Sequence, residues 1–192
     1  LMVSPDDVSG LAALIGGGLL DPREIVAVIG KTEGNGGAND FTRALATLSV
    51  ARCIADFTGE SVEEVTARVT LIWSGGCEGV ISPHATVFSR KSGGNGNGPS
   101  LTLGIGRSRV VLPEEIGTLT QVELSAEAVQ AAMRDAGITS PADVHYVQVK
   151  GPLLTPARIA DARARGKQVI NADPNASKPM GRGALALGVA TA

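Results

Sequence analysis

Residues 18–31, GLLDPREIVAVIGK, and residues 137–150, GITSPADVHYVQVK, share one plan, and that plan decides the fold. Each segment begins at a glycine that ends a helical pattern, passes through a proline turn and finishes in a β-branched run that ends on a lysine. The two segments align without a gap, so that Lys31 and Lys150 occupy one structural position. The sequence therefore predicts two copies of one helix–turn–strand unit.

A second pair of matching segments follows the two lysines. TRALATLSVA around Arg43 aligns with GRGALALGVA around Arg182, which predicts a helix that carries an arginine in each unit. The second unit is longer between its lysine and its arginine, and the additional residues include the helical pattern TPARIADARARG at residues 155–166. Each unit therefore contributes a lysine and then an arginine.

The first unit continues into another helix and a further strand. SVEEVTARV has Ser61 at the N-cap with Glu64 at the capping-box position, and the strand TLIW that follows ends in the Ser-Gly-Gly sequence beginning at Ser74. In the second unit, SAEAVQAAMRDAG has its N-cap signal at Ser125, but the counterpart of Ser74 would lie beyond Ala192. We therefore expect one complete unit and part of a second, as in a fragment or the product of a truncated gene.

These patterns predict an α/β protein made of α+β repeat units, with a first domain at residues 1–112 and an incomplete second domain at residues 113–192. KSGGNGNGPS, residues 91–100, has no periodicity and predicts an exposed loop. LTLGIGRS, residues 101–108, has the pattern of another strand of the first domain, which places the boundary near Pro113.

Composition excludes several classes of partner and site. The net charge is −2 with basic and acidic residues interspersed, so neither nucleic acid nor a membrane surface is an expected partner. The chain begins without the basic and apolar regions of a signal peptide, and we expect a cytoplasmic protein that binds a small molecule. Cys53 and Cys77 lack the spacing of a metal site or a disulfide framework, which predicts two reduced thiols, no metal and no cofactor.

Lys31 ends a strand that has a buried pattern and opens the glycine-rich loop GKTEGNGGAND. A nucleotide-binding module with a phosphate-binding loop is the rival interpretation, but the GxxxxGKT pattern requires glycine where this chain has Ile25. A surface lysine is the ordinary interpretation of any single Lys. The repetition of Lys at position 150 favours a shared role for the two residues.

Ser74 follows a strand and precedes two glycines whose amides are suited to stabilise an oxyanion, although a Ser-Gly-Gly turn explains the same residues. A serine beside an uncharged lysine is a nucleophilic arrangement that needs no histidine, and His145 lies inside a predicted strand. Arg43 and Arg182 have planar donor forks that suit carbonyl oxygens or a delocalised anion. As single residues, they would be solvated arginines on helices.

Six motifs occur in one order along nearly the whole chain: GKTEGNGGANDFTR, WSGGCEGVISPHATVFSR, LTLGIGRS, LPEEIG, VHYVQVKGPLLTPARI and GRGALALGVA. Together they resemble the ring-opening amidohydrolase family of cyanuric acid hydrolases and barbiturases. The resemblance implies three similar domains around a pseudo-threefold axis. Each is a β-sheet with helices, and each gives a Lys, an Arg and a Ser to a central pocket.

The resemblance also assigns roles to single residues. Lys31, Arg43 and Ser74 are similar to the set of the first domain, and Lys150 and Arg182 are similar to the Lys and Arg of the second. The family's second Ser-Lys pair is taken as nucleophile and base, so the resemblance makes Lys150 the catalytic base. It places a metal site in a third domain that these 192 residues do not include, and it implies a homo-tetramer for full-length members.

The reaction that the resemblance implies is the ring opening of a cyclic amide. A serine attacks one carbonyl of cyanuric acid, carboxybiuret forms, and loss of carbon dioxide gives biuret. Ser74 and the backbone amide of Gly75 would hold a ring carbonyl, while Arg43 and Arg182 would hold the charge of the acidic ring. The alternatives are a barbiturase that acts on barbituric acid and a non-catalytic fragment that only binds its ligand.

Overall fold

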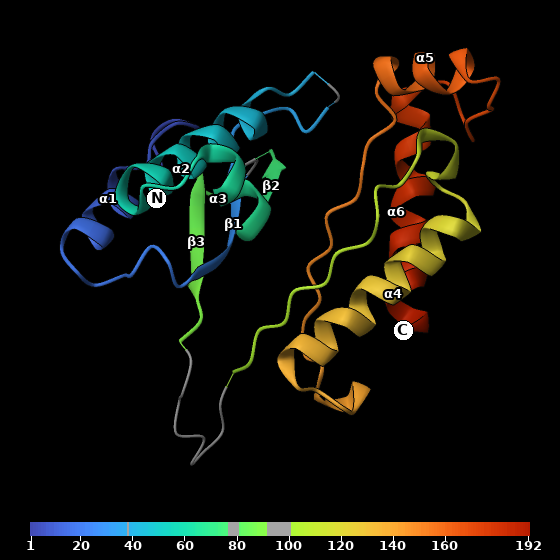
Figure 1. Ribbon diagram of the computed structural model, residues 1–192. Helices are drawn as coiled ribbons and strands as arrows, with labels where there is room; N and C mark the ends of the chain where they lie inside the picture. Colours follow the sequence, from blue (N-terminus) through green and yellow to red (C-terminus); the bar gives the residue numbers. More distant parts are fainter. Residues whose placement is uncertain (38, 77–80, 92–100) are drawn as a thin grey trace. The chain divides into compact units, whose positions relative to one another are not determined.

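A computed structural model describes residues 1–37, 39–76, 81–91 and 101–192 (Figure 1). The chain forms two compact units, Leu1–Asn97 and Gly98–Ala192. Helices together with a three-stranded sheet place it in the predicted α/β class. Among the described residues, no helix has the length and apolar composition needed to cross a bilayer. Cys77 and all but the first residue of the predicted loop at 91–100 lie outside this description.

The two units divide earlier in the chain than the boundary near Pro113 that the sequence suggested. Residues 101–108 were expected to form a strand of the first domain, but they form no regular strand. They lie on α4 (Leu119–Ala136) of the second unit, where a Cβ added to Gly104 would be 1.9 Å from the carbonyl oxygen of Ala132. Because Gly104 has no side chain, this backbone can lie directly against a helix.

The first unit is a small sheet covered by helices (Figure 1). Its elements are α1 (Ser9–Gly16), β1 (Ile25–Thr32), α2 (Thr42–Thr58), α3 (Val62–Arg68), β2 (Thr70–Gly75) and β3 (His84–Ser89). The strand order is β2-β1-β3, with β1 parallel to β2 and antiparallel to β3. The predicted capping box at the start of α3 is confirmed, since Ser61 and Glu64 bond to each other's backbone N–H.

One face of this sheet forms the core of the first unit. The core combines apolar side chains of the strands and of α2, among them Val28, Leu71, Trp73, Val50 and Ile54. Successive side chains point to opposite faces of a sheet, so Lys31 and Ser74 turn away from this core. Cys53 is a free cysteine within it, and burial raises the pKa of its thiol.

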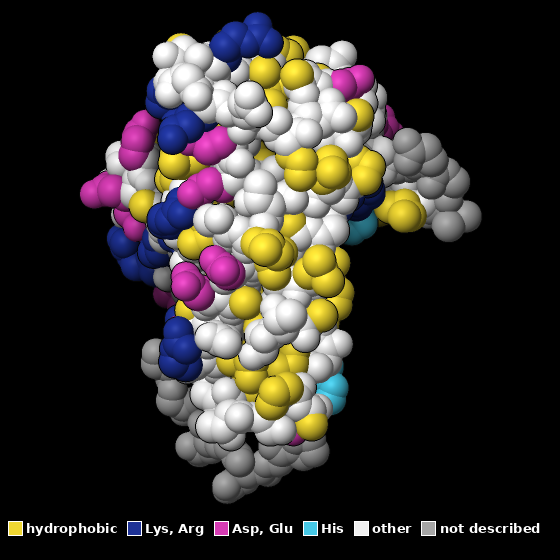
Figure 2. Space-filling view, turned by 90° about the vertical axis from the view of Figure 1, so that its right-hand side faces the viewer, with side chains coloured by type: hydrophobic (Ala, Val, Ile, Leu, Met, Phe, Trp, Pro, Cys, Tyr) yellow, Lys and Arg dark blue, Asp and Glu magenta, His cyan; other side chains and the backbone are white. Residues whose placement is uncertain are grey.

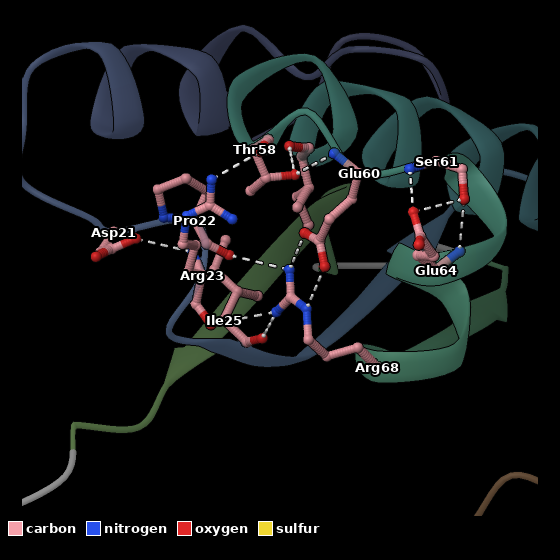
Figure 3. A network of polar contacts seen from close by, with 10 residues as sticks. Asp21, Pro22, Arg23, Ile25, Thr58, Glu60, Ser61, Glu64 and Arg68 are labelled. Atoms are coloured by element: carbon pink, nitrogen blue, oxygen red, sulfur yellow. Dashed lines mark hydrogen bonds and ion pairs between the residues drawn. The ribbon is translucent and has the colours of Figure 1, made fainter.

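Arg68, the last residue of α3, connects this helix to the start of β1 (Figure 3). Its guanidinium pairs with Glu60, with Nη2 2.7 Å from Oε2, and its Nη1 donates to the carbonyl of Ile25 at 2.8 Å. Arg23, in the turn before β1, donates to the carbonyl of Thr58 at 2.8 Å. The hydrogen bond from Arg68 holds the pKa of Glu60 below its usual value. These charge-assisted bonds fix where β1 enters the sheet.

The second unit is built on two long helices. Its regular elements are the 3₁₀ turns η1 (Pro113–Glu115) and η2 (Pro141–Asp143) and the helices α4, α5 (Pro156–Ala164) and α6 (Pro174–Thr191). α4 and α6 approach so closely that a Cβ added to Gly188 would lie 2.4 Å from the Cβ of Ser125. α5 and α6 confirm the helices predicted around TPARIADARARG and GRGALALGVA.

Oppositely charged side chains lie beside one another on the surface of the second unit (Figure 2). Arg165 binds both carboxylate oxygens of Glu114, at 2.7 and 2.8 Å, and Arg109 pairs with Glu115 at 2.7 Å. The hydrogen bonds from Arg165 lower the pKa of Glu114 to about 2. Exposed pairs of this kind add little to stability, but they leave no large surface of one sign on this face.

The two copies of the repeat end their helices in the same way. Gly18 and Gly137 have positive φ angles of 71° and 70°, and the residue after each donates its N–H to the carbonyl five residues earlier. Asp21 and Ser140 then each accept a side-chain hydrogen bond from the backbone N–H two residues later. The local geometry predicted from the sequence is therefore present in both copies.

The copies differ after this turn. In the second one, residues 144–150 were predicted as a strand but have no strand partner among the described residues, whereas β1 pairs with a strand on each side. A ladder needs a neighbour to accept its hydrogen bonds. The N-cap predicted at Ser125 is also wrong: α4 begins at Leu119, and the buried Ser125 donates its hydroxyl to the carbonyl of Gln121 at 2.6 Å.

Gly30 lies where β1 passes under the indole of Trp73. A Cβ at Gly30 would be 2.3 Å from a ring carbon of Trp73 and 2.5 Å from the carbonyl oxygen of His84. We expect Gly30→Ala to lower the free energy of unfolding by about 1–3 kcal/mol, the usual cost of overpacking. Urea denaturation followed by tryptophan fluorescence measures this change.

Gly10→Ala is the matched control, because nothing lies within 4 Å of a Cβ at this position in α1. This variant should be as stable as the wild type or slightly more stable, since alanine favours a helix over glycine. Equal destabilisation by the two substitutions would rule out the steric explanation for Gly30.

Candidate active site

Lys31 and Ser74 lie side by side at the carboxyl ends of two parallel strands. The ladder between β1 and β2 pairs the two residues directly. Lys31 Nζ is 3.3 Å from Ser74 Oγ and donates to the carbonyl of Gly75 at 3.0 Å. Each residue was singled out in the sequence because it follows a strand, and the parallel pairing brings the two together. An amine within hydrogen-bond reach of a hydroxyl is the arrangement that activates a serine nucleophile.

His84, which no sequence pattern singled out, lies on the other side of Lys31. The antiparallel ladder between β1 and β3 pairs Lys31 with His84, so the three side chains from neighbouring strands form one row. His84 Nδ1 is 2.7 Å from the carbonyl oxygen of Ser82, which only accepts hydrogen bonds, so Nδ1 carries a proton. The start of a strand after SP was the available signal, but its register against β1 cannot be derived from the sequence.

The loop between β1 and α2 is closed by the carboxylate of Asp40, which is fully buried. Its Oδ2 accepts from the backbone N–H of Gly36 at 2.9 Å, and its Oδ1 accepts from the backbone N–H of Thr42 at 3.0 Å and from the Thr42 hydroxyl. The same carboxylate touches the end of β2, since a Cβ added to Gly75 would lie 2.2 Å from Oδ2. One buried side chain therefore joins the glycine-rich loop to the residue that follows Ser74.

Arg43 is held beside this loop rather than extended into solvent. Its Nη2 donates to the carbonyl of Gly37 at 2.6 Å, and its Nε lies 3.4 Å from Asp40 Oδ2. The side chain is 27% exposed, so part of the guanidinium remains accessible from outside. Arg43 can therefore bind an anion or a carbonyl oxygen without first losing its present partners.

Lys150 and Arg182, the two candidate residues of the second unit, are both exposed. Lys150 precedes Gly151, at which an added Cβ would lie 2.4 Å from Leu185 of α6, the helix that carries Arg182. In the first unit, Thr32 follows Lys31 and its hydroxyl is 2.8 Å from that of Thr42, which precedes Arg43. In both units, therefore, the residue after the lysine contacts the helix of the arginine.

Among the residues that the structure describes, no three His, Cys, Asp or Glu side chains gather in a way that would hold a metal ion. The side chains described above offer a hydroxyl, an amine, an imidazole and a guanidinium. These groups suit proton transfer and the binding of oxygen atoms.

The family model described as "Amidohydrolase ring-opening protein" matches residues 1–192, the full length of the chain. The chain belongs to this family. Among the ring-opening amidohydrolases, a cyclic amide hydrolase from Azorhizobium caulinodans is 61% identical over 98% of this chain. A cyanuric acid amidohydrolase from Bradyrhizobium diazoefficiens is 50% identical over 98% of it, and Barbiturase 2 from a Nocardioides species is 46% identical over 97%.

A solved structure of a cyanuric acid hydrolase has the same fold, with a TM-score of 0.92 and 51% identity over 98% of this chain. The chain spans about half the length of these proteins: 52% of the Azorhizobium and Bradyrhizobium relatives, 51% of the barbiturase and 52% of the solved chain. The family resemblance inferred from the motifs is therefore confirmed. So is the expectation that this chain corresponds to only part of such a protein.

A pKa of Asp40 below the usual value indicates that the hydrogen bonds closing the loop are made. Burial raises the pKa of Asp40, but the hydrogen bonds from Thr42 and Gly36 outweigh it and hold the pKa below the usual value of 3.8. Because the pKa is lower in the folded state, the carboxylate stabilises the fold above pH 3.8, and this contribution is lost as the pH falls through the folded pKa. A ¹³C NMR titration of the Asp40 carboxyl should therefore have its midpoint below 3.8.

Two threonine variants separate this cause from a general effect of substitution in α2. Thr42→Val removes one hydroxyl donor and should raise the midpoint for Asp40. Thr47→Val should leave it unchanged, since the Thr47 hydroxyl bonds to the carbonyl of Arg43 and not to Asp40. A wild-type midpoint at or above the usual value of 3.8 would contradict the closed loop, because it would mean that these hydrogen bonds are not made in solution.

Proposed function

We propose that this chain acts in the hydrolytic ring opening of a cyclic amide and that cyanuric acid is the substrate. The observation that carries this proposal is the distance of 3.3 Å between Lys31 Nζ and Ser74 Oγ at the ends of two paired strands. Membership of the ring-opening amidohydrolase family supports it, as do the relatives named for cyanuric acid.

In the proposed reaction, Ser74 is the nucleophile and Lys31 its base. Ser74 Oγ attacks a ring carbonyl carbon while its proton passes to the uncharged Nζ of Lys31. The ring C–N bond then breaks, the leaving nitrogen takes that proton, and the opened ring stays attached to Ser74 as an acyl group. A water molecule attacks this acyl group and returns a proton to Ser74 through Nζ. The product is carboxybiuret, which loses carbon dioxide to give biuret.

Backbone amides and arginines would stabilise the charge that develops on the ring oxygens. We assign the Gly75 amide, together with the Ser74 hydroxyl, to bind a ring carbonyl. The Gly75 carbonyl accepts from Lys31. Arg43 would hold a second oxygen through its exposed part. Lys150 and Arg182, which match Lys31 and Arg43 in the repeat, are the proposed base and substrate-binding residue of a second set.

Barbituric acid is the second candidate substrate, because Barbiturase 2 is 46% identical to this chain. Both rings present a carbonyl–amide–carbonyl edge, so the same attack by Ser74 applies to either. The family resemblance further suggests a homo-tetramer in the cytoplasm that acts on a small cyclic amide.

Binding and hydrolysis by this chain test the proposal. Calorimetry measures the affinity for cyanuric acid and for barbituric acid, and the release of biuret or of the opened barbiturate measures turnover. We expect Ser74→Ala and Lys31→Met to abolish turnover while cyanuric acid still binds. We expect Arg43→Gln to weaken binding by about tenfold or more, as the loss of a charged hydrogen bond does. The matched controls are Ser49→Ala, at a half-buried position in α2, and Lys91→Met, at an exposed position after β3.

The possible results separate the assignments from one another. Turnover that survives Ser74→Ala but is lost in Lys150→Ala would transfer the nucleophilic role to the second unit. Saturable binding without turnover in the wild type would support a non-catalytic ligand binder. If the wild type binds neither ring at millimolar concentration, the proposal fails for this chain.

A further inference from the structure

We propose that Asp40 is the positioning residue of this site: its buried carboxylate fixes Arg43 and Gly75 relative to the Lys31–Ser74 pair. The inference deepens the proposed function and rests on it for the identity of the ligand. Its structural part concerns only the described residues of the first unit and can be tested without any ligand.

Asp40 is a buried charge whose partners belong to the loop it closes. Both carboxylate oxygens accept hydrogen bonds, from Gly36 within the loop and from Thr42 at the start of α2. A buried carboxylate without partners is strongly disfavoured, so the closed form of the loop is the one in which this charge is tolerated. The same bonds hold the chain directly before Arg43 in place.

The Asp40 carboxylate fits between two glycines, at positions where a side chain would clash with it. A Cβ at Gly34 would lie 1.9 Å from Asp40 Oδ1, and a Cβ at Gly75 would lie 2.2 Å from Asp40 Oδ2. Gly34 is in the loop after β1 and Gly75 ends β2, so Asp40 fills the gap between the ends of two neighbouring strands. These contacts, which leave no space for a side chain, transmit the position of the loop to the strand that carries Ser74.

Two short paths lead from Asp40 to the groups proposed to react or to bind. Through Gly75, whose carbonyl accepts from Lys31 Nζ, Asp40 fixes the acceptor that holds the lysine beside Ser74. Through Nε of Arg43, at 3.4 Å, it sets the direction of the guanidinium. The Arg43 contacts to Asp40 and Gly37 engage Nε and Nη2, so Nη1 is the nitrogen assigned to a ligand oxygen.

Asp40→Asn is the sharpest test, because it keeps the size of the side chain and removes its charge. The amide nitrogen must replace either Oδ2, which accepts from the Gly36 N–H, or Oδ1, which accepts from both Thr42 donors, so at least one donor loses its acceptor. Asp56→Asn is the matched control: it makes the same change of charge at an exposed position in α2. Thermal unfolding verifies that both variants are folded at the temperature of the measurements.

The first measurement needs no ligand. Hydrogen exchange of the Arg43 Nε–H and the amide shift of Gly75 are followed by ¹⁵N NMR. In Asp40→Asn we expect exchange at Arg43 to accelerate by about tenfold or more, because the ion pair at Nε is lost. The Gly75 resonance should move, because the side chain packed beside Gly75 changes. Asp56→Asn should change neither. An unchanged Arg43 signal in a folded Asp40→Asn variant overturns the proposal.

The second measurement is a double-mutant cycle on the affinity for cyanuric acid. If Asp40 acts through Arg43, Asp40→Asn weakens binding in the wild type but has little further effect in the Arg43→Gln background. Equal losses in both backgrounds would show that Asp40 does not act on binding through Arg43, and the positioning of Arg43 would be rejected. If the wild type does not bind cyanuric acid, the proposed function fails, while the NMR result still decides whether Asp40 positions Arg43 and Gly75.

Discussion

The parallel pairing of β1 with β2 is the constraint on which the first unit depends. In a parallel ladder the carboxyl ends of neighbouring strands meet at one edge of the sheet, so residues near these ends lie side by side. Lys31 and Ser74 each precede the last residue of their strand, and their contact follows from the register. The groups around them are arranged to keep this register: Arg68 fixes the start of β1, and Asp40 fixes the loop after it.

Much of this site could be predicted from the sequence because the signals are local. The capping box at Ser61, the glycine ends of the helices and the strands before Lys31 and Ser74 each depend on a few adjacent residues. Asp40 and His84 could not be found in this way. Asp40 matters through a contact with the end of another strand, and His84 matters through its register with β1, and neither relation is encoded in neighbouring residues.

The two copies of the repeat show the same distinction between local and distant interactions. The helix end and the turn are alike in both, because their hydrogen bonds close within the segment. The predicted strand at residues 144–150 differs from β1, since a strand depends on neighbours elsewhere in the chain. Residues 101–108 have the sequence pattern of a strand, but among the described residues they pair with no sheet. Their glycines allow this backbone to lie against α4, which is also a contact with a distant part of the chain.

Trp73 has a consequence for how this protein can be observed. It is the single tryptophan of the chain, it is buried, and it precedes Ser74 while its ring covers Gly30, the residue before Lys31. An indole in this place senses the packing of both strands at the point where they present the amine and the hydroxyl. Its emission spectrum is therefore an intrinsic optical reporter on the site, without any label.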